Sequence, residues 1–447
     1  MDIKNLVKES ISKSNIFRKY QMVDYSQIKN RFSEEDLSLE ASKLGVIVKH
    51  GEILKCDSIK ELIKTPPNMA LADAVGNGQL NADGVNIRIL KGDTLCMTYS
   101  NYINTYKNQH TKKRHLKPHK KKFKLFFKRY TGQDLNKKRL LIWRTGGIGD
   151  IMFSQPIVMY LKKKYNCRID YATSPPIMSL FDCWPKGLIT KVIPMPFPKK
   201  HLIKSNYHLS FEGAIERCTQ AETVNAYDIF NQVANLDIDP HKYPIKLTPP
   251  KDVVEKIRKD VPDNMILIQM RSSSAIRSME AKRWIEIMNG LKDMGYTVGI
   301  IDNYRMSYVY EKIKEANKIE HVINMAPLSK NLTDGIAIMS LCKGLIGIDS
   351  SFTHLSAALN KPTFGIYGPF PGHIRMKYYK NVDWYDTEGY EECGKYPCFY
   401  HQEELSKCPF VSKRLPSGCL SSVDTTKVLE KFQNLLREVE NNHGEKN

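Results

Sequence analysis

The chain has 447 residues, a formal net charge of +20 at pH 7, and 41% hydrophobic and 10% aromatic residues. This length exceeds what one hydrophobic core usually covers, so two or three domains are expected. No apolar run reaches about 18 residues, which argues against a membrane-spanning helix. The first residues lack the apolar core of a signal peptide, so we expect a cytoplasmic location, and ten cysteines in that setting indicate mainly reduced thiols.

Residues 1–110 are predicted to form a small separate region of unknown role. Two β-hairpins are expected in it. One turns at His50-Gly51, and the other turns at residues 91–93, between strands over 85–90 and 94–99. The stretch from residue 65 to Gly84, which contains prolines and glycines, is predicted to be loop.

Residues 111–139, called the basic strip below, carry thirteen lysines and arginines and one acidic residue, Asp134. The strip is predicted to be a connector. Its charge favours an anionic partner: nucleic acid, lipid headgroups or a phosphorylated glycan. Apolar residues between the lysines allow it to lie on a membrane or to pack against the protein, and a solvated linker helix without a partner is the alternative. Candidate anion-binding residues are Lys120, Lys121, Lys122 and Lys124.

The first candidate site begins at an apolar strand over residues 140–143. A glycine loop with Gly146, Gly147 and Gly149 follows, and then a helix predicted to run to Tyr165. A strand, a glycine loop and a helix N-terminus are a common setting for binding and catalysis. Arg144 in this loop is a candidate acceptor- or anion-binding residue. Asp150 either caps its helix or acts as a catalytic base.

Strands and helices then alternate, which predicts parallel sheets covered on both faces. Expected strands are residues 169–172, 188–193, 265–270, 296–301, 322–324, 344–348 and 363–367, and expected helices are residues 284–294 and 424–440. Thr248-Pro249-Pro250 is predicted to be a linker. The fold class is therefore α/β, with Rossmann-like domains at 140–247 and 252–422 facing a cleft and a C-terminal helix and tail at 423–447.

The second candidate site follows the strand at 344–348. Asp349, Ser350 and Ser351 precede an alanine-rich helix whose first turn holds His354. Backbone N–H groups and serine hydroxyls at such a place can bind a diphosphate. The alternatives are that Asp349 only interacts with the helix N-terminus and that His354 is structural.

The two motifs together resemble glycosyltransferase family 9, which contains the lipopolysaccharide heptosyltransferases. The resemblance rests on the segment from Arg144 to Asp150, on Lys282-Arg283-Trp284, on the segment from Asp349 to Leu359, and on Lys361-Pro362-Thr363 with Gly368-Pro369. It covers residues 140–440 and implies the GT-B fold. Ser351 replaces the family's glycine, the loop before Lys282 is longer than usual and adds Arg277, and residues 1–139 have no counterpart.

What the resemblance implies is an inverting transfer of a sugar from a nucleoside diphosphate sugar to an acceptor hydroxyl. Asp150 would be the general base, and Asp349 would bind the donor sugar, from the opposite wall of the crevice. The remaining donor-binding positions would be Ser272, Ser273, Lys282, Ser350, Ser351 and His354. No cofactor and no metal are expected, because Lys282 and helix amides would offset the charge of the leaving group. An ordinary surface role is the alternative for Lys282.

Three functions remain open. A surface-glycan transferase, with lipopolysaccharide as the first candidate acceptor, would work in the cytoplasm or at the inner membrane face. A phage-type DNA glycosyltransferase would use the basic strip to bind the duplex and would act on a modified base. A non-catalytic binding protein of the same fold is the third. The sequence does not specify the oligomeric state.

Four late cysteines raise the question of a structural zinc. Their spacing departs from the paired short knuckles of common zinc sites, so ordinary thiols are the favoured interpretation. These residues are Cys393, Cys398, Cys408 and Cys419.

Overall fold

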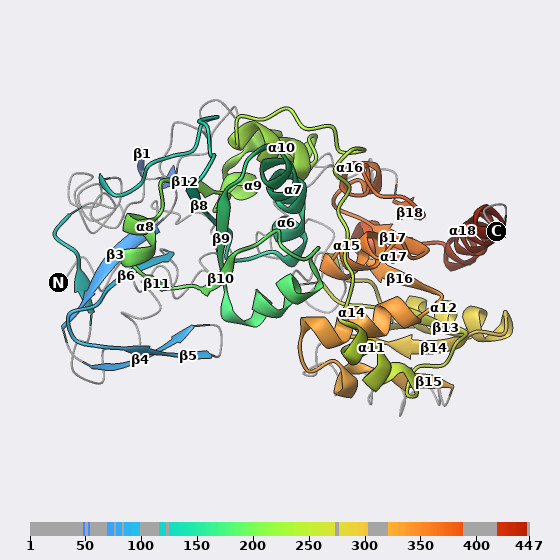
Figure 1. Cartoon of the computed structure of the whole chain (residues 1–447). Helices are drawn as coiled ribbons and strands as arrows, with labels where there is room; N and C mark the ends of the chain where they lie inside the picture. Colours follow the sequence, from blue (N-terminus) through green and yellow to red (C-terminus); the bar gives the residue numbers. More distant parts are fainter. Residues whose placement is uncertain are drawn as a thin grey trace. The chain divides into compact units, whose positions relative to one another are not determined.

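The computed structural model (Figure 1) describes ten stretches of the chain. They are residues 48–49, 52–53, 69–75, 77–82, 85–98, 116–121, 125–272, 277–302, 321–387 and 418–444. The chain forms two compact units: unit 1 holds residues 1–178 and 186–243, and unit 2 holds residues 179–185 and 244–447. Among the described helices, none combines the length and the apolarity that crossing a bilayer requires.

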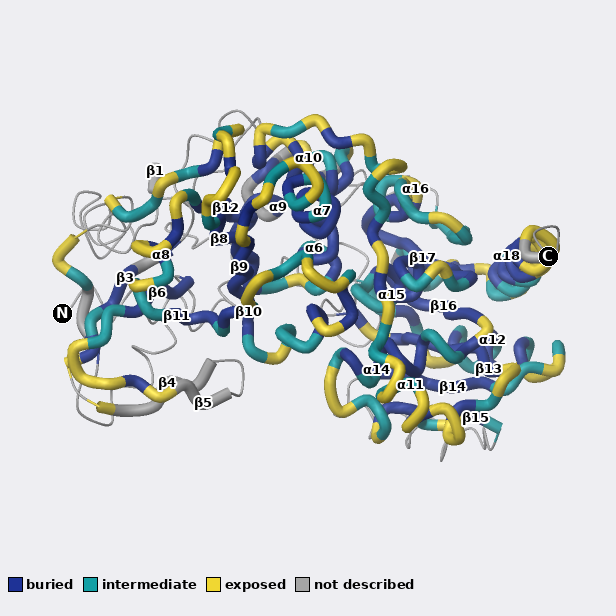
Figure 2. The backbone as a smooth tube through the Cα atoms, viewed as in Figure 1, coloured by how far each residue is buried: buried dark blue, intermediate teal, exposed yellow. Residues whose placement is uncertain are grey.

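Unit 1 contains a parallel sheet of four strands in the order β10-β9-β8-β12. Its strands are β8 (Arg139–Trp143), β9 (Arg168–Thr173), β10 (Lys191–Pro194) and β12 (Tyr207–Ser210), and its helices include α6 (Ile148–Phe153), α7 (Gln155–Lys164), α8 (Lys200–Lys204), α9 (Ala214–Arg217) and α10 (Ala226–Val233). Figure 2 shows the strands as largely buried. The strands predicted at 140–143 and 169–172 are confirmed. The next strand begins only at Lys191, because residues 186–187 form a turn with Gly187 at φ 80°.

The helix predicted from residue 151 to Tyr165 is divided into α6 and α7 at Ser154. Pro156 lies in the first turn of α7. Proline has no backbone N–H, so it cannot continue the hydrogen-bond ladder of α6 but suits a helix start.

A second, antiparallel sheet in unit 1 corrects the prediction for the N-terminal residues. Its order is β11-β6-β3-β7, and β4 and β5 form a separate pair. These strands are β3 (Met69–Ala74), β4 (Gly78–Ala82), β5 (Val85–Ile89), β6 (Thr94–Thr98), β7 (Leu116–Pro118) and β11 (Phe197–Pro198). The loop predicted to end at Gly84 is therefore wrong, since β3 and β4 lie within it.

The turn predicted at residues 91–93 exists, with Asp93 N–H donating to the Leu90 carbonyl over 3.0 Å, but its flanking strands do not pair with each other. Instead, β5 pairs with β4 and β6 pairs with β3. The sequence between β4 and β5 is Asp83-Gly84, a two-residue pair typical of tight hairpins. The hairpin predicted around His50-Gly51 is confirmed, because β1 (Val48–Lys49) pairs with β2 (Glu52–Ile53) in antiparallel fashion.

The described part of the basic strip after residue 124 packs against the body of unit 1. Phe126 and Phe127 contact the core that includes Trp143, and Tyr130 is buried. Arg129 forms a parallel bridge with His208 of β12. A solvated linker helix is therefore the wrong interpretation of residues 125–139, which contain no α-helix.

His208 is a buried, neutral histidine in unit 1. Its Nε2 donates to the Leu202 carbonyl over 2.9 Å, and its Nδ1 accepts from Lys128 N–H over 2.8 Å. Burial lowers the pKa of His208 to about 4. Protonation would also remove the lone pair that Lys128 N–H uses.

The depressed pKa of His208 predicts a loss of stability in acid. Between pH 6.5, the pKa of an unperturbed histidine, and about pH 4, the unfolded chain binds more protons than the folded chain. The free energy of unfolding therefore falls as the pH falls through that window. Above about pH 6.5 this contribution does not change with pH. We expect unit 1 to lose on the order of 2 kcal/mol. Hydrogen exchange of the β8 and β12 amides at pH 7 and 5 measures this. In His208→Gln the loss should shrink, and an equal loss in that variant would contradict the assignment.

Unit 2 contains a six-stranded parallel sheet in the order β15-β14-β13-β16-β17-β18. Its strands are β13 (Met265–Gln269), β14 (Thr297–Ile300), β15 (Val322–Asn324), β16 (Gly344–Ile348), β17 (Thr363–Tyr367) and β18 (Val382–Asp386). All but β18 were predicted, and β18 is half-buried and rich in polar residues. From β13 the chain adds strands first on one side of the sheet (β14, β15) and then on the other (β16, β17, β18), so the strand order changes direction between β13 and β16. The crevice beyond the strand ends at such a point is where ligands bind in α/β sheets.

The helices of unit 2 include α11 (Lys251–Arg258), α12 (Ala281–Asp293), α14 (Leu332–Leu341), α15 (Ser351–Ala358), α16 (Gly372–Arg375), α17 (Gly418–Ser421) and α18 (Thr425–Gly444). The final helix was predicted to bury one face. In α18, Val428, Phe432, Leu435 and Val439 are buried in the same core as Trp284 and Met288 of α12, which confirms that prediction.

Candidate functional site

The glycine loop of unit 1 places a carboxylate beside a buried arginine. Gly147, at φ 70°, is the N-cap of α6, and Asp150 lies in the first turn of that helix. Arg144 Nη2 lies 2.5 Å from Asp150 Oδ2, with the arginine side chain 1% and the aspartate side chain 23% exposed. Arg144 Nε also donates to the Gly146 carbonyl over 2.8 Å. The arginine thus fixes the loop and orients a carboxylate that solvent can reach.

A second carboxylate, Glu212, is buried next to this loop. Its two oxygens accept from the backbone N–H and the hydroxyl of Thr145, both over 2.9 Å. Glu212 follows β12, a strand that the sequence analysis did not predict, so the residue was missed. Burial raises the pKa of Tyr171, and the charges of Glu212 and Asp150 raise it further while Arg144 opposes them. These charges therefore act on one small region of unit 1.

Gly147 is required at its position for two reasons. Its φ of 70° disfavours any residue with a side chain, and a Cβ built there would collide with the Asp150 carboxylate. We expect Gly147→Ala to cost about 1 kcal/mol in stability and to displace Asp150 from Arg144, so that the sugar transfer implied by the resemblance of the motifs should fall at least about tenfold. Thermal unfolding and a transfer assay measure both effects.

Gly187→Ala is the matched control for this prediction. Gly187 has a similar φ of 80°, but a Cβ there meets no atom within 4 Å. We expect it to share the backbone cost and keep its activity. Equal activity losses in the two variants would show that the collision with Asp150 is irrelevant.

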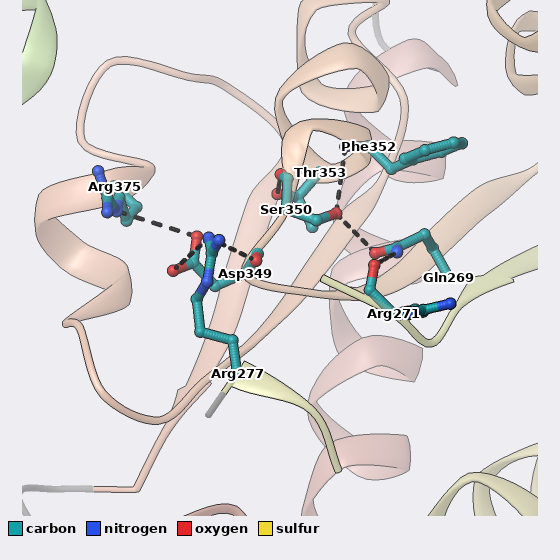
Figure 3. Close-up of polar contacts among 8 residues, drawn as sticks. All are labelled: Gln269, Arg271, Arg277, Asp349, Ser350, Phe352, Thr353 and Arg375. Carbon is teal, nitrogen blue, oxygen red and sulfur yellow. Dashed lines mark hydrogen bonds and ion pairs between the residues drawn. The ribbon is translucent and has the colours of Figure 1, made fainter. Parts of the chain in front are cut away.

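In unit 2, hydrogen bonds connect the residues at the carboxyl ends of β13 and β16, where the strand order changes direction (Figure 3). Ser350 Oγ donates to Gln269 Oε1 over 2.6 Å and accepts from Phe352 N–H over 3.2 Å, so Ser350 is the N-cap of α15. The Gln269 amide also contacts Asp302, over 3.4 Å. Burial raises the pKa of Asp302, which the sequence analysis did not single out, to about 6.

Asp349 lies between two arginines at this edge. Arg277 Nη1 is 3.4 Å from Asp349 Oδ2, and Arg375 Nε is 3.9 Å from Oδ1. Figure 3 shows both guanidinium groups directed at the carboxylate. Arg375 also stacks on the Phe370 ring, 3.9 Å from its centroid. Two cations and one anion beside the N-terminus of α15 favour an anionic ligand.

His354 is buried within the same group of residues. Burial lowers its pKa to about 4, with a further lowering from Arg375 and an opposing contribution from Asp349. The ring is therefore neutral at pH 7. A neutral ring can donate one hydrogen bond and accept another. The positive charge of the site comes from Arg277 and Arg375.

The other predicted site residues are placed as follows. Ser272 is buried, Ser351 is the half-buried first residue of α15, and Lys282 is exposed in the first turn of α12. Lys120 and Lys121 are exposed. Ser273, Lys122 and Lys124 lie outside the described residues, as do Cys393, Cys398 and Cys408. Cys419 is a free thiol, and the described residues contain no group of three side chains able to hold a metal ion.

The chain is similar to known proteins both in sequence and in structure. Residues 209–405 match the model of glycosyltransferase family 9 (heptosyltransferase). Lipooligosaccharide heptosyltransferase 2 of Haemophilus influenzae is 29% identical over 97 residues, which span 20% of this chain and 28% of that protein.

Two solved structures share the fold. A family 9 glycosyl transferase from Veillonella parvula is similar with a TM-score of 0.54 and 15% identity, over 68% of this chain and 99% of that one. The iron-containing dodecameric glycosyltransferase TibC from enterotoxigenic Escherichia coli is similar with a TM-score of 0.50 and 15% identity, over 84% and 93% of the two chains.

The two α/β units define a protein of the GT-B fold class. More particularly, residues 209–405 match glycosyltransferase family 9, and the chain is similar to heptosyltransferases over part of its length. The resemblance seen in the motifs is thereby confirmed.

Proposed function

We propose that the chain transfers a sugar, with inversion, from a nucleoside diphosphate sugar to an acceptor hydroxyl. The observation that carries this proposal is the Asp349 site, where Arg277, Arg375 and the N-terminus of α15 surround one carboxylate inside the matched family domain. A nucleoside diphosphate is the leaving group that such a site suits, because its charge increases as the glycosidic bond breaks.

The donor would bind to unit 2. Arg277, Arg375, Ser350 and Ser351 would face the diphosphate, and Asp349 would accept hydrogen bonds from sugar hydroxyls. Ser272, Ser273, Lys282 and His354 would complete the site. The name of the Haemophilus relative makes a heptosyl donor and a lipooligosaccharide-type acceptor the first candidates.

Asp150 would be the general base. A sugar hydroxyl is a poor nucleophile at neutral pH, so a positioned carboxylate that removes its proton accelerates the reaction. Asp150 has the partial exposure that contact with an acceptor needs, and buried Arg144 holds it in one orientation. The relatives give no support to the alternative of a DNA glycosyltransferase.

We propose that the transfer needs no metal, since the cations of the Asp349 site offset the leaving-group charge. The related TibC is iron-containing, so this point requires its own measurement. The protein is treated with a chelator, and the chelator is then removed. The rate of sugar transfer should stay within about twofold of the rate of untreated protein. Loss of transfer that iron or magnesium restores would contradict metal independence.

Donor binding tests the proposal directly. A panel of ADP-, GDP- and UDP-sugars should contain one nucleotide class that raises the unfolding temperature; a ligand at about 100 times its Kd adds about 2.7 kcal/mol. Mass spectrometry should then detect slow hydrolysis of the stabilising sugar. If no nucleotide sugar or nucleotide binds, the chain is a non-catalytic protein of this fold.

A further inference from the structure

One face of unit 1 combines basic charge with isolated apolar side chains. It is formed by residues 119–128 of the basic strip, as far as the structure describes them, and by helix α8, and we call it the basic face. The two segments meet over His208: Lys128 N–H donates to Nδ1 of this ring, and its Nε2 donates to Leu202 of α8. Lys199, just before α8, lies 5.2 Å from the centroid of the Phe126 ring. The described parts of the two segments are therefore neighbours in unit 1.

The two most exposed large apolar side chains of the described residues both belong to the basic face. Leu125 is 65% and Ile203 is 63% exposed, whereas Leu90, Ile323 and Val75 are 45% or less. Their neighbours point inward: Leu202 is buried, and Phe126 and Phe127 pack against the same core. Leu125 and Ile203 are therefore exposed next to residues that pack into the core of unit 1.

The charge on this face is almost entirely positive. Its exposed lysines include Lys120, Lys121, Lys128, Lys200 and Lys204, and exposed Lys191 of β10 lies close to His201 of α8. The pKa of His201 in α8 is lowered by burial and further by Lys191, Lys200 and Lys204, with an opposing contribution from Asp170. The nearby acids are already engaged, since Asp73 Oδ1 lies 2.7 Å from His119 Nδ1 and Asp170 Oδ2 lies 2.5 Å from Arg139 Nη1.

We propose that the basic face docks on an anionic lipid bilayer. A bilayer accounts for both features of the face: acidic headgroups attract the lysines, and the interface accepts Leu125 and Ile203. A nucleic acid or a free phosphate would use the lysines alone and would leave the two aliphatic side chains in water. The docking goes beyond the transfer chemistry and does not depend on it.

Vesicle cosedimentation of the full chain tests the docking. Vesicles with about 30% phosphatidylglycerol in phosphatidylcholine should bind the protein. Its affinity for vesicles of phosphatidylcholine alone should be at least about tenfold lower. Leu125→Glu with Ile203→Glu should lower binding to the anionic vesicles at least about tenfold, because the change removes apolar contacts and adds negative charge. Lys200→Gln with Lys204→Gln should act in the same direction.

Matched variants in unit 2 serve as controls. Ile323→Glu changes another exposed aliphatic residue, and Lys251→Gln with Lys256→Gln changes two exposed lysines of α11. Both should bind vesicles like the unchanged protein, and thermal unfolding should show that all variants are folded. The proposal is overturned if the face variants bind as well as the controls, if both vesicle types bind equally, or if the lysine variants alone lose binding.

Discussion

Replacing Asp150 by asparagine is expected to lower the rate of sugar transfer by about 10³-fold. The amide has nearly the shape of the carboxylate, so it can keep the contact with Arg144 but cannot take a proton from the acceptor. Initial rates at saturating donor and acceptor measure the effect. Donor affinity should stay within about twofold, because the proposed donor contacts all lie in unit 2.

Asp239→Asn is the matched control, since Asp239 is an exposed aspartate of the same unit. It should transfer at the unchanged rate. A D150N variant that keeps full activity would remove Asp150 from the mechanism. If D150N lost donor binding as well as transfer while remaining folded, Asp150 would instead belong to the donor site.

The combined variant Arg277→Gln with Arg375→Gln is expected to weaken donor binding at least about 100-fold. Each guanidinium would give up a charge-assisted hydrogen bond to phosphate, and such bonds contribute about 1.5–3 kcal/mol. Isothermal titration calorimetry with the nucleotide alone measures the loss. In the Arg277/Arg375 variant the buried Asp349 carboxylate has lost both arginines, which can destabilise the fold. A triple variant that also carries Asp349→Asn removes this buried charge. If the triple variant is folded and still binds the nucleotide weakly, the loss is an effect on binding.

Arg283→Gln is the control for the arginine variants. Arg283 in α12 contacts Glu286 and lies next to Lys282, but not at Asp349. Its nucleotide affinity should be unchanged. If the unchanged protein binds nucleotide and the Arg277/Arg375 variant binds it equally well, the diphosphate is placed elsewhere in unit 2.

The parallel sheets were predictable because their strands are continuous apolar runs. Met265–Gln269 and Gly344–Ile348 are buried along their whole length, and the apolar runs of the sequence predict buried strands at these places. In contrast, Tyr207–Ser210 and Val382–Asp386 contain polar residues and were missed. Their place in the sheet comes from pairing with neighbours distant in the sequence.

The N-terminal pairing shows the limit of local reasoning most clearly. Residues 94–98 pair with residues 69–73 and also with Phe197–Pro198, more than a hundred residues away. A turn at 91–93 suggests a hairpin, but the strand partners are decided by the core they bury together. That core includes Met69, Leu71, Cys96 and Trp143.

The candidate site was predictable where a motif stands in one short segment. Asp150 and Asp349 follow strands that could be recognised. Arg375 was missed because its sequence neighbours do not reveal that it returns to Asp349. Arg277 was noted only as an added charge, and Glu212 follows a strand that was not predicted.

A crystal structure of the chain with a nucleoside diphosphate sugar tests most directly whether unit 2 binds the donor. We expect the diphosphate at the N-terminus of α15, within hydrogen-bond distance of Arg277 and Arg375. We expect the sugar hydroxyls at Asp349. A nucleotide bound away from the strand ends of β13 and β16 would contradict this expectation.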